Sequence, residues 1–357
     1  MDAVYIIAEA GVNHNGQRDL AFALVDAAAR AGVDAVKFQT FSAVKLAARS
    51  APKAAYQKQS IGADETQLAM LQKLELPRAW HRELQDHAHQ RGIEFLSTAF
   101  DMDSLDFLLE LGMPLFKIPS GELTNGPLLW RFARSGKPLV LSTGMATLSE
   151  VEQGLAIVAH ALAFESEPGS IDEVWQHWSR SESRRRLRGQ VTLLHCTSQY
   201  PTPFAEVNLR GMDTLAAAFG LEVGYSDHTE GTLIPVAAVA RGASIIEKHF
   251  TLDRSLPGPD HKASLGPEEL AQMVRDIRAL QVALGDGSKC PQPGEWDTRQ
   301  AARQQVVAAR DIASGALLTR EDLTTARCGR GLMPTELWGL VGKTASRDFA
   351  AGEIVEA

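Results

Sequence analysis

The chain has 357 residues, of which 45% are hydrophobic and 22% are charged, and its formal net charge is −8. These values are ordinary for a globular protein, and the length suits a large domain followed by a small one. The negative charge argues against a general nucleic-acid binder, although a local pocket could still be basic. Three cysteines without CxxC spacing indicate neither a disulfide framework nor a zinc finger, and they suit a reducing cytoplasm. We expect no signal peptide and no membrane span.

Short apolar runs typical of β-strands alternate with amphipathic helical stretches from residue 4 to residue 285. Eight strand–helix units favour a (β/α)8 TIM barrel over residues 1–285. A doubly wound open sheet is the alternative, but no GxGxxG follows the first strand. The expected strands are Val4–Ala8, Ala35–Gln39, Glu94–Ser97, Pro114–Ile118, Leu139–Ser142, Val191–His195, Glu222–Tyr225 and Ser244–Glu247.

The remaining chain predicts a linker, a small domain and two insertions. Residues 286–303 are rich in glycine and proline and read as a linker. Residues 304–357 contain very short strand-like runs, and a domain of this size is marginal alone, so we expect it to dock on the barrel or on another subunit. Insertions at 41–77 and 166–190 interrupt the barrel rhythm. We interpret the arginine-rich second insertion as a solvated surface rather than an anion-binding one.

Two histidines occupy similar settings at the ends of consecutive predicted strands, His228 in Ser-Asp-His-Thr and His249 in Glu-Lys-His-Phe. In a barrel the carboxyl ends of the strands carry the active site, so both imidazoles are expected on one rim. That arrangement suits a divalent metal, whereas the alternative is two histidines that only hydrogen-bond nearby loops.

Nearly every other predicted strand also ends in a polar or ionisable residue. Lys37 and Lys117, together with hydroxyl groups, could form an anion cage, or each could pair with a glutamate as a structural ion pair. Glu9 and Glu122 are candidate acid–base groups or simple loop anchors. Among the other histidines, His14 reads as a turn residue, and we expect His81, His87 and His89 on the surface of a polar helix.

Taken in chain order, these strand ends resemble the sialic acid (N-acetylneuraminate) synthase family. The residues after 304 resemble its SAF, or antifreeze-like, module, so the resemblance spans essentially the whole chain. The matching motifs are Ala8–Gly16, Val36–Thr40, Ser97–Asp101, Phe116–Glu122, Leu141–Met145, His195–Pro201, Tyr225–Thr229, Glu247–Phe250 and Pro257–His261.

The resemblance implies an enzyme that condenses phosphoenolpyruvate with an open-chain N-acetylated hexose, releasing phosphate and forming a nine-carbon 2-keto acid. It implies His228 and His249 as ligands of a divalent metal, usually Mn²⁺, with Mg²⁺ or Co²⁺ as alternatives. It also implies a domain-swapped homodimer in which Arg327 of the SAF domain reaches the other subunit's site. The implied phosphoenolpyruvate cage is Lys37, Thr98, Lys117, Ser120, Ser142 and Ser226, and the implied sugar- or water-binding groups are Glu9, Gln39, Glu122, Tyr200 and Asp260.

The chain departs from the family pattern in two site motifs. Cys328 follows Arg327 where the family usually has proline, and Ser198 stands where an asparagine often contacts phosphoenolpyruvate. We still expect Ser198 to bind substrate. The main expectation is N-acetylneuraminate synthase acting on N-acetylmannosamine, with N,N'-diacetyllegionaminate synthase as the alternative. The Ser120–Glu122 motif and the segment from Tyr56–Lys58 to Glu75 argue against a pseudaminate synthase. A non-catalytic carbohydrate-binding protein is the remaining alternative.

Overall fold

The computed structural model describes residues 3–48, 51–52 and 66–356. The chain divides into two compact units, Met1–Asp286 and Gly287–Ala357. Within the described ranges, no helix is both long enough and apolar enough to cross a membrane.

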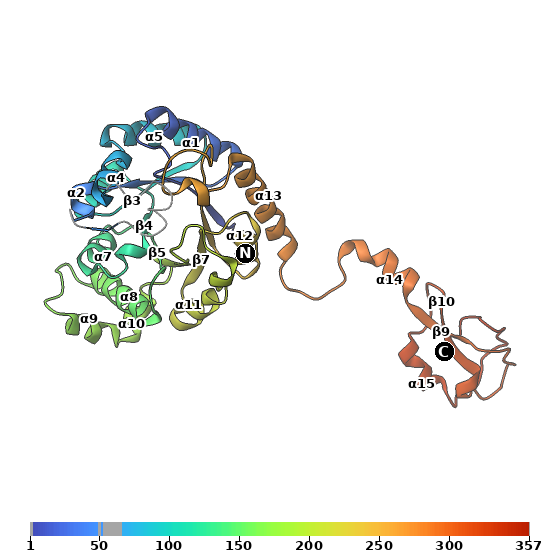
Figure 1. Cartoon of the computed structure of the whole chain (residues 1–357). Helices are drawn as coiled ribbons and strands as arrows, with labels where there is room; N and C mark the ends of the chain where they lie inside the picture. The colour runs from blue at the N-terminus through green and yellow to red at the C-terminus, as the bar shows by residue number, and fades with distance from the viewer. Residues whose placement is uncertain (1–2, 49–50, 53–65, 357) are drawn as a thin grey trace. The chain divides into compact units, whose positions relative to one another are not determined.

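The first unit is a barrel of eight parallel strands surrounded by helices (Figure 1), as the sequence predicts. The hydrogen-bonded order is β3-β2-β1-β8-β7-β6-β5-β4, and β3 also contacts β4, so the sheet curls nearly closed. Several strands continue one to three residues beyond the predicted ends, into segments that contain Glu9, Thr98, Asp227 and His249. The strands are β1 Tyr5–Gly11, β2 Ala35–Thr40, β3 Glu94–Ala99, β4 Phe116–Ile118, β5 Leu139–Ser142, β6 Val191–His195, β7 Glu222–Asp227 and β8 Ile245–His249.

The helices that cover the strands have clear start and stop signals. Helix α1 ends at Gly32, whose φ of 80° is readily adopted only by glycine, and α8 begins with a capping box between Thr147 and Glu150. These local signals separate each helix from the strand that follows or precedes it. The covering helices are α1 Arg18–Ala31, α5 Arg78–Gln90, α6 Met102–Leu111, α7 Gly126–Ala133, α8 Leu148–Ala163, α11 Gly211–Phe219, α12 Leu233–Ala240 and α13 Pro267–Leu284.

The barrel interior has an apolar layer and a polar layer, spaced two residues apart along the strands. The apolar layer is a separate buried cluster that includes Ile7, Ala35, Leu96, Val140, Leu194 and Ile245. Because side chains on a strand alternate between its faces, the residue two positions later also faces the interior. Those later residues are Glu9, Lys37, Thr98, Ser142, Cys196 and Glu247. The strand period therefore places the chemically active groups on top of a packed apolar floor.

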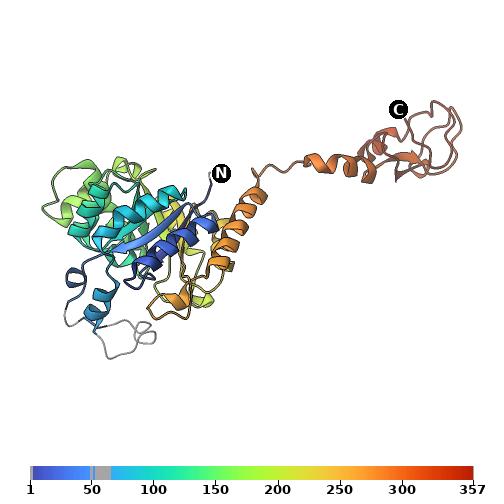
Figure 2. The same ribbon diagram turned by 90° about the horizontal axis from the view of Figure 1, so that it is seen from above.

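The first insertion contributes α2 Ala43–Leu46 and α4 Gln67–Leu74. Phe41, Met70 and Leu74 form a small apolar cluster there with Val12. In Figure 2 these two helices lie at the end of the barrel toward which the strands point. The segment Tyr56–Lys58 lies outside the described residues, so the structure does not bear on its part in the expectation against a pseudaminate synthase.

The second insertion forms α9 Ile171–Trp178 and α10 Ser181–Arg185. Val174 and Trp178 are buried, and α9 packs on α8. The arginines of this segment are exposed, which confirms the prediction of a solvated surface; they are Arg180, Arg184, Arg185, Arg186 and Arg188.

The surface assignment of His81 is wrong. Its side chain is 0% exposed, and its Nε2 lies 2.7 Å from the Thr40 hydroxyl, which in turn lies 2.6 Å from the Ser97 hydroxyl. The imidazole links α5 to the barrel strands, and Gln85 is buried on the same face of this polar helix. His89 is exposed as expected, and the partly exposed His87 lies 2.9 Å from Asp26.

The second unit is built from short elements around its own core, as predicted. Strands β9 Gln304–Ala308 and β10 Leu323–Arg327 pair antiparallel, and α15 spans Leu337–Leu340. The expected linker, residues 286–303, contains the short helix α14 Trp296–Ala302. The core includes Val306, Ile312, Leu318, Leu323, Leu337, Phe349 and Val355.

Candidate active site

A cavity of about 490 Å³ lies at the carboxyl ends of the barrel strands and collects nearly all the predicted site residues. Its apolar wall comes from the first insertion, including Leu46, Met70 and Leu74. The predicted residues that line it are Glu9, Lys37, Gln39, Thr98, Lys117, Ser120, Glu122, Ser198, Tyr200, Ser226, His228, His249 and Asp260.

Two predicted residues are not among those that line the cavity. Ser142 is 2% exposed at the end of β5, and its hydroxyl finds no hydrogen-bond partner among the described residues. Arg327 ends β10 in the second unit, where its side chain is exposed. The structure therefore gathers the barrel candidates other than Ser142, and it does not test the role of Arg327.

A network of buried charges occupies the floor of the cavity. The Lys37 ammonium lies 2.5 Å from Glu9 and 3.5 Å from Glu247, and Lys117 lies 2.9 Å from Glu247. Lys37 also donates to the Thr98 hydroxyl at 3.0 Å. The ion-pair alternative is therefore present in this structure, yet both lysines still face the cavity. Together they offer two cationic donors to an incoming anion.

Glu247 pairs with both lysines of the cavity, a role that was not predicted from the sequence. Besides the two lysines, it accepts a hydrogen bond from the Ser226 hydroxyl at 2.8 Å. The signal was the strand period, since Glu247 lies two residues before His249 and must face the same side of β8. It is the central counter-ion of the cavity floor.

Three buried carboxyl groups, Glu9, Glu247 and Asp260, line the cavity beside two lysines. The pKa of Glu247 is lowered, whereas the pKa values of Glu9 and Asp260 are raised. Burial alone would raise the pKa of Glu247, but Lys117 and Lys37 hold it below its usual range. Burial raises the pKa of Glu9 despite the pairing with Lys37. Burial, with a contribution from Glu9, raises the pKa of Asp260 to about 7. The site can therefore hold a carboxyl proton near neutral pH, as acid–base chemistry requires.

The two histidines lie side by side on the same rim, with ring centroids 5.5 Å apart. The Nδ1 of His228 lies 2.7 Å from the Thr197 carbonyl, so it carries the proton and leaves Nε2 with a free lone pair. The Nδ1 of His249 is buried 4.0 Å from an Asp260 oxygen, and no residue in the described ranges forms a hydrogen bond with it. Burial lowers the pKa of His228 to about 4 and that of His249 well below its usual range.

These features fit a metal-binding pair, because a metal requires neutral imidazoles with available lone pairs. No group of three or more His, Cys, Asp or Glu side chains in the part of the chain that the structure describes is arranged to hold a metal. Two protein ligands would leave coordination positions open for substrate and water.

Three more predicted residues shape the cavity around these charges. The Tyr200 ring lies 4.1 Å from the His228 ring and 5.7 Å from the His249 ring, measured between centroids. Gln39 donates to Glu9 at 3.2 Å. The partly exposed Glu122 accepts from Asn125 at 2.7 Å, which leaves it at the edge of the cavity rather than in the charge network.

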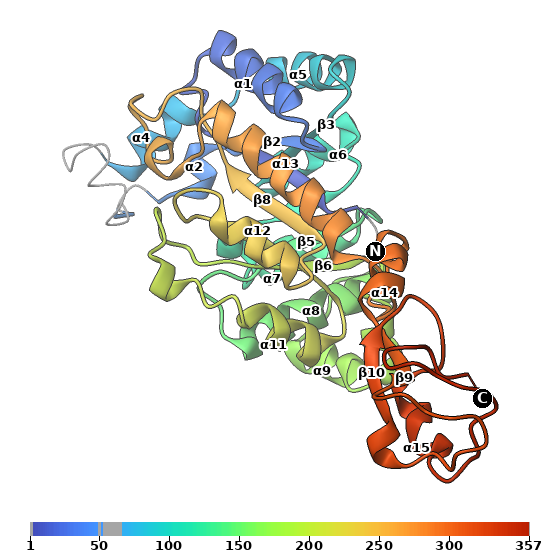
Figure 3. The ribbon, with the colours of Figure 1, turned by 90° about the vertical axis from the view of Figure 1, so that its right-hand side faces the viewer.

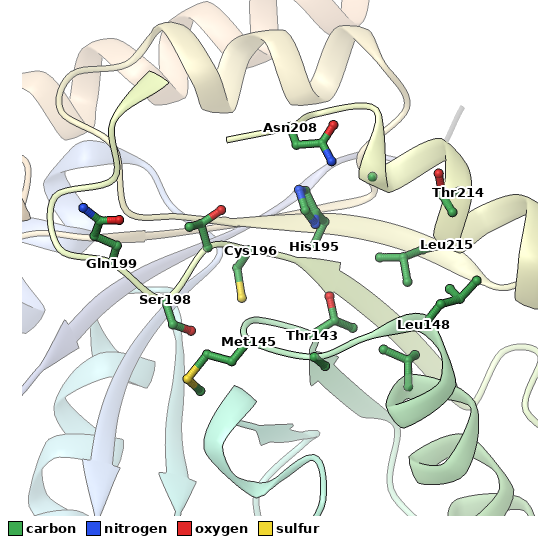
Figure 4. A pocket seen from close by; sticks show the side chains of 14 residues that line it. Thr143, Met145, Leu148, His195, Cys196, Ser198, Gln199, Asn208, Thr214 and Leu215 are labelled. Atoms are coloured by element: carbon green, nitrogen blue, oxygen red, sulfur yellow. The ribbon is translucent and has the colours of Figure 1, made fainter. Parts of the chain in front are cut away.

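Ser120, Ser198 and Cys196 crowd around Gly144 on the β5–β6 side. The Gly144 amide donates to the Ser120 hydroxyl at 3.0 Å, and a Cβ at Gly144 would come within 2.9 Å of the Cys196 sulfur. Cys196, Ser198 and Met145 also line a neighbouring cavity of about 530 Å³ (Figure 4). Among the described residues, no lysine or carboxylate lines this second cavity, and its His195 is bound to the Val207 carbonyl at 2.9 Å. The buried lysines and carboxylates described above line the first cavity.

Comparison with known proteins agrees with this arrangement. The model of the NeuB family matches residues 24–289, and that of the SAF domain matches residues 303–357. The chain belongs to the NeuB family. The expected family and enzyme class, a nonulosonic acid synthase with a barrel and a SAF domain, are thereby confirmed.

Two curated relatives are both named N,N'-diacetyllegionaminic acid synthase. The N,N'-diacetyllegionaminic acid synthase of Campylobacter jejuni is 45% identical over 355 residues, covering 99% of each chain. That of Legionella pneumophila is 46% identical over 348 residues, covering 98% of this chain and 92% of the relative. Among solved structures, the N-acetylneuraminic acid synthetase of Leptospira borgpetersenii superposes with a TM-score of 0.67 at 32% identity, covering 84% of this chain and 91% of its own.

Proposed function

We propose that this NeuB-family protein condenses phosphoenolpyruvate with an open-chain N-acetylated amino sugar, forming a nine-carbon 2-keto acid and releasing phosphate. The observation that carries the proposal is the cavity floor itself. Two buried lysines lie there, one on each side of Glu247, and two neutral imidazoles stand on the same rim. An anionic substrate and a carbonyl substrate can therefore be held next to each other.

Lys37 and Lys117 are the anion-binding groups in this account. Both are almost completely buried, so their charges act in a medium of low dielectric constant. They would neutralise the phosphate and carboxylate of phosphoenolpyruvate, with Thr98, Ser120 and Ser226 donating hydroxyl hydrogen bonds. Charge already positioned for the anion stabilises the developing phosphate leaving group without rearrangement.

His228 and His249 would hold a divalent cation, with Mn²⁺ as the first candidate and Mg²⁺ or Co²⁺ as alternatives. When bound, such a cation supplies Lewis-acid polarisation of the sugar aldehyde. The enol carbon of phosphoenolpyruvate can then attack that aldehyde, and water adds to the resulting cationic carbon before phosphate leaves by C–O cleavage. Tyr200, Gln39 and Asp260 surround this position and would orient the sugar and the water.

The proton transfers fall to the buried carboxyl groups. Glu9 faces Lys37 and Gln39 in the cavity floor, whereas Glu122 lies at the edge. We favour Glu9 over Glu122 as the group that activates water. Glu9→Gln should then lower kcat strongly with little change in KM, and Glu122→Gln should mainly change KM for the sugar. If both variants kept near-normal kcat, neither glutamate would be the base.

For the sugar, we favour 2,4-diacetamido-2,4,6-trideoxymannose, which would make the protein an N,N'-diacetyllegionaminate synthase. The two relatives that are 45% and 46% identical along nearly the whole chain carry that name. The main expectation from the sequence, N-acetylneuraminate synthase, becomes the second candidate, supported by the Leptospira borgpetersenii structure at 32% identity.

A steady-state assay of phosphate release distinguishes the candidates. The protein is given phosphoenolpyruvate, Mn²⁺ and either the diacetamido sugar or N-acetylmannosamine. We expect kcat/KM at least about tenfold higher for the diacetamido sugar, equivalent to roughly 1.4 kcal/mol of transition-state binding. A tenfold preference in the other direction would establish the second candidate. No phosphate release with any amino sugar would favour the carbohydrate-binding alternative.

We also propose a homodimer in which Arg327 completes the partner's site. The test is complementation between two inactive variants, His228→Ala and Arg327→Ala, exchanged into mixed dimers. If Arg327 acts across the interface, each mixed dimer has one intact site, and a statistical mixture recovers about one quarter of the wild-type activity. If Arg327 acts on its own barrel, no mixed dimer has an intact site and no activity returns.

A further inference from the structure

Two oppositely charged residues are buried directly behind the paired histidines. Asp227 precedes His228 and Lys248 precedes His249, and the side chains of both charged residues are 0% exposed. Neither lines the substrate cavity, although the histidines do. Because side chains alternate along a strand, Asp227 and Lys248 face the helix layer. Helix α12 contacts both strands on that side, and α13 packs beside it (Figure 3).

The two charged residues are bonded across the β7–β8 ladder. Asp227 is the direct register partner of Lys248, and the Lys248 ammonium donates to the Asp227 carboxylate and to the Thr229 carbonyl. Asp227 in turn accepts from the Thr229 amide at 3.2 Å and from its hydroxyl at 3.0 Å. The pair therefore joins the two strands at the last position of their ladder and binds the turn that follows His228.

Few hydrogen bonds on the cavity side orient the rings of His228 and His249. In the described part of the chain, the His228 ring has one hydrogen bond, to the Thr197 carbonyl, and the His249 ring has no hydrogen-bond partner at Nδ1. His249 is the register partner of Glu9 on β1, so the direction of its ring depends on how β8 is held between β1 and β7, and Lys248 is the last β8 residue paired with β7. A buried ion pair is a weak means of gaining stability, since apolar residues of similar volume are often as good or better. Directional bonds behind two candidate ligands are better suited to fixing geometry.

We propose that the Asp227–Lys248 pair is a positioning device that sets the separation and direction of the His228 and His249 imidazoles, and so sets the affinity of the site for a divalent cation. This inference rests on the proposed metal-binding role of the two histidines. It assigns a function to residues that touch neither substrate nor metal. The reason is that outer groups that orient metal ligands control metal affinity.

The test is Mn²⁺ binding to the metal-free, full-length protein, measured by calorimetry with the metal alone. The variant is Asp227→Asn with Lys248→Met, which removes both charges while keeping similar volumes. We expect its Kd for Mn²⁺ to rise on the order of tenfold, while its midpoint of urea unfolding stays close to that of the wild type. The control, Asp34→Asn with Arg278→Met, removes a partly exposed ion pair of 2.7 Å between the residue before β2 and helix α13, at the other end of the barrel. It should leave Mn²⁺ affinity unchanged.

The outcomes separate this inference from the proposed function. If the wild type binds Mn²⁺, His228→Ala abolishes binding and the double variant binds as tightly as the wild type, only the positioning role is overturned. If the wild type itself does not bind Mn²⁺, the metal site and the positioning role both fall. Should the double variant not fold, Thr229→Val removes one bond to Asp227 and leaves the ion pair. It should weaken Mn²⁺ binding in the same direction, and unchanged affinity would overturn the inference.

Discussion

Neutralising Glu247 should destabilise the free protein and make phosphoenolpyruvate a stronger stabiliser. Glu247→Gln keeps the shape and the hydrogen bonds but removes the negative charge between two buried lysines. At an effective dielectric constant of about 20, the 2.9 Å contact with Lys117 corresponds to about 6 kcal/mol and the 3.5 Å contact with Lys37 to about 5 kcal/mol of gross attraction. Desolvation offsets much of this attraction, and removing one partner of a buried pair typically costs about 3–5 kcal/mol. We therefore expect a loss of about 3 kcal/mol, since glutamine retains the hydrogen bonds.

Bound phosphoenolpyruvate should restore part of this loss, because its anionic groups would take over the neutralisation of the lysines. The assay is urea unfolding of wild type and Glu247→Gln, each with and without a fixed concentration of phosphoenolpyruvate. A ligand that binds only the folded state stabilises it by RT ln(1 + [L]/Kd), so tighter binding appears directly as a larger shift. We expect the ligand-induced shift to be larger in the variant.

A matched control is Glu222→Gln, which removes an exposed carboxylate at the start of β7. It should change neither the stability nor the response to phosphoenolpyruvate. The reasoning would be refuted if Glu247→Gln unfolded at the same urea concentration as the wild type. It would also be refuted if phosphoenolpyruvate stabilised both proteins equally, because the lysines would then not be the anion-binding groups.

Two further predictions concern packing and pH. Gly144→Ala places a Cβ against the hydroxyls of Ser198 and Ser120, so KM for phosphoenolpyruvate should rise severalfold. In the control, Gly121→Ala, the Cβ would meet no atom of the described residues within 4 Å, so KM should stay unchanged. Equal KM values for the two variants would show that the residues around Gly144 do not contact the substrate. Burial lowers the pKa of His81 to about 4, so the unfolded chain binds a proton below its usual pKa of about 6.5 and the folded protein does not. Stability from this group is thus full above pH 6.5 and lost toward pH 4, by up to about 3 kcal/mol. The difference in unfolding free energy between wild type and His81→Gln should shrink between pH 7 and pH 4.5, and a constant difference would contradict the buried, neutral imidazole.

The barrel was predictable because its periodicity is strong. The gathering of polar residues in one cavity was predictable because the carboxyl ends of barrel strands meet at one rim. Apolar runs such as Leu139–Ser142 and Val191–His195 coincide with strands in the structure. Where a strand ends in active-site residues, as β8 does at Glu247–His249, its polar end reads as a loop. The boundary was therefore placed two residues early.

Other features depended on tertiary contacts or on a weaker signal. His81, Leu84, Gln85 and Ala88 share helical spacing and form the buried face of α5, so the pattern for His81 was present but hidden among polar neighbours. The pairing of Glu247 with two lysines from β2 and β4 joins residues far apart in the chain. Only the closure of the barrel brings these charges together.

The fate of the bridging oxygen of phosphoenolpyruvate tests the proposed condensation most directly. The protein is incubated with phosphoenolpyruvate labelled with ¹⁸O at that position, the diacetamido sugar and Mn²⁺, and the products are analysed by mass spectrometry. We predict a nine-carbon 2-keto acid without the label and phosphate that carries it, because the C–O bond breaks. Labelled pyruvate, or label retained in the organic product, would contradict the proposed condensation.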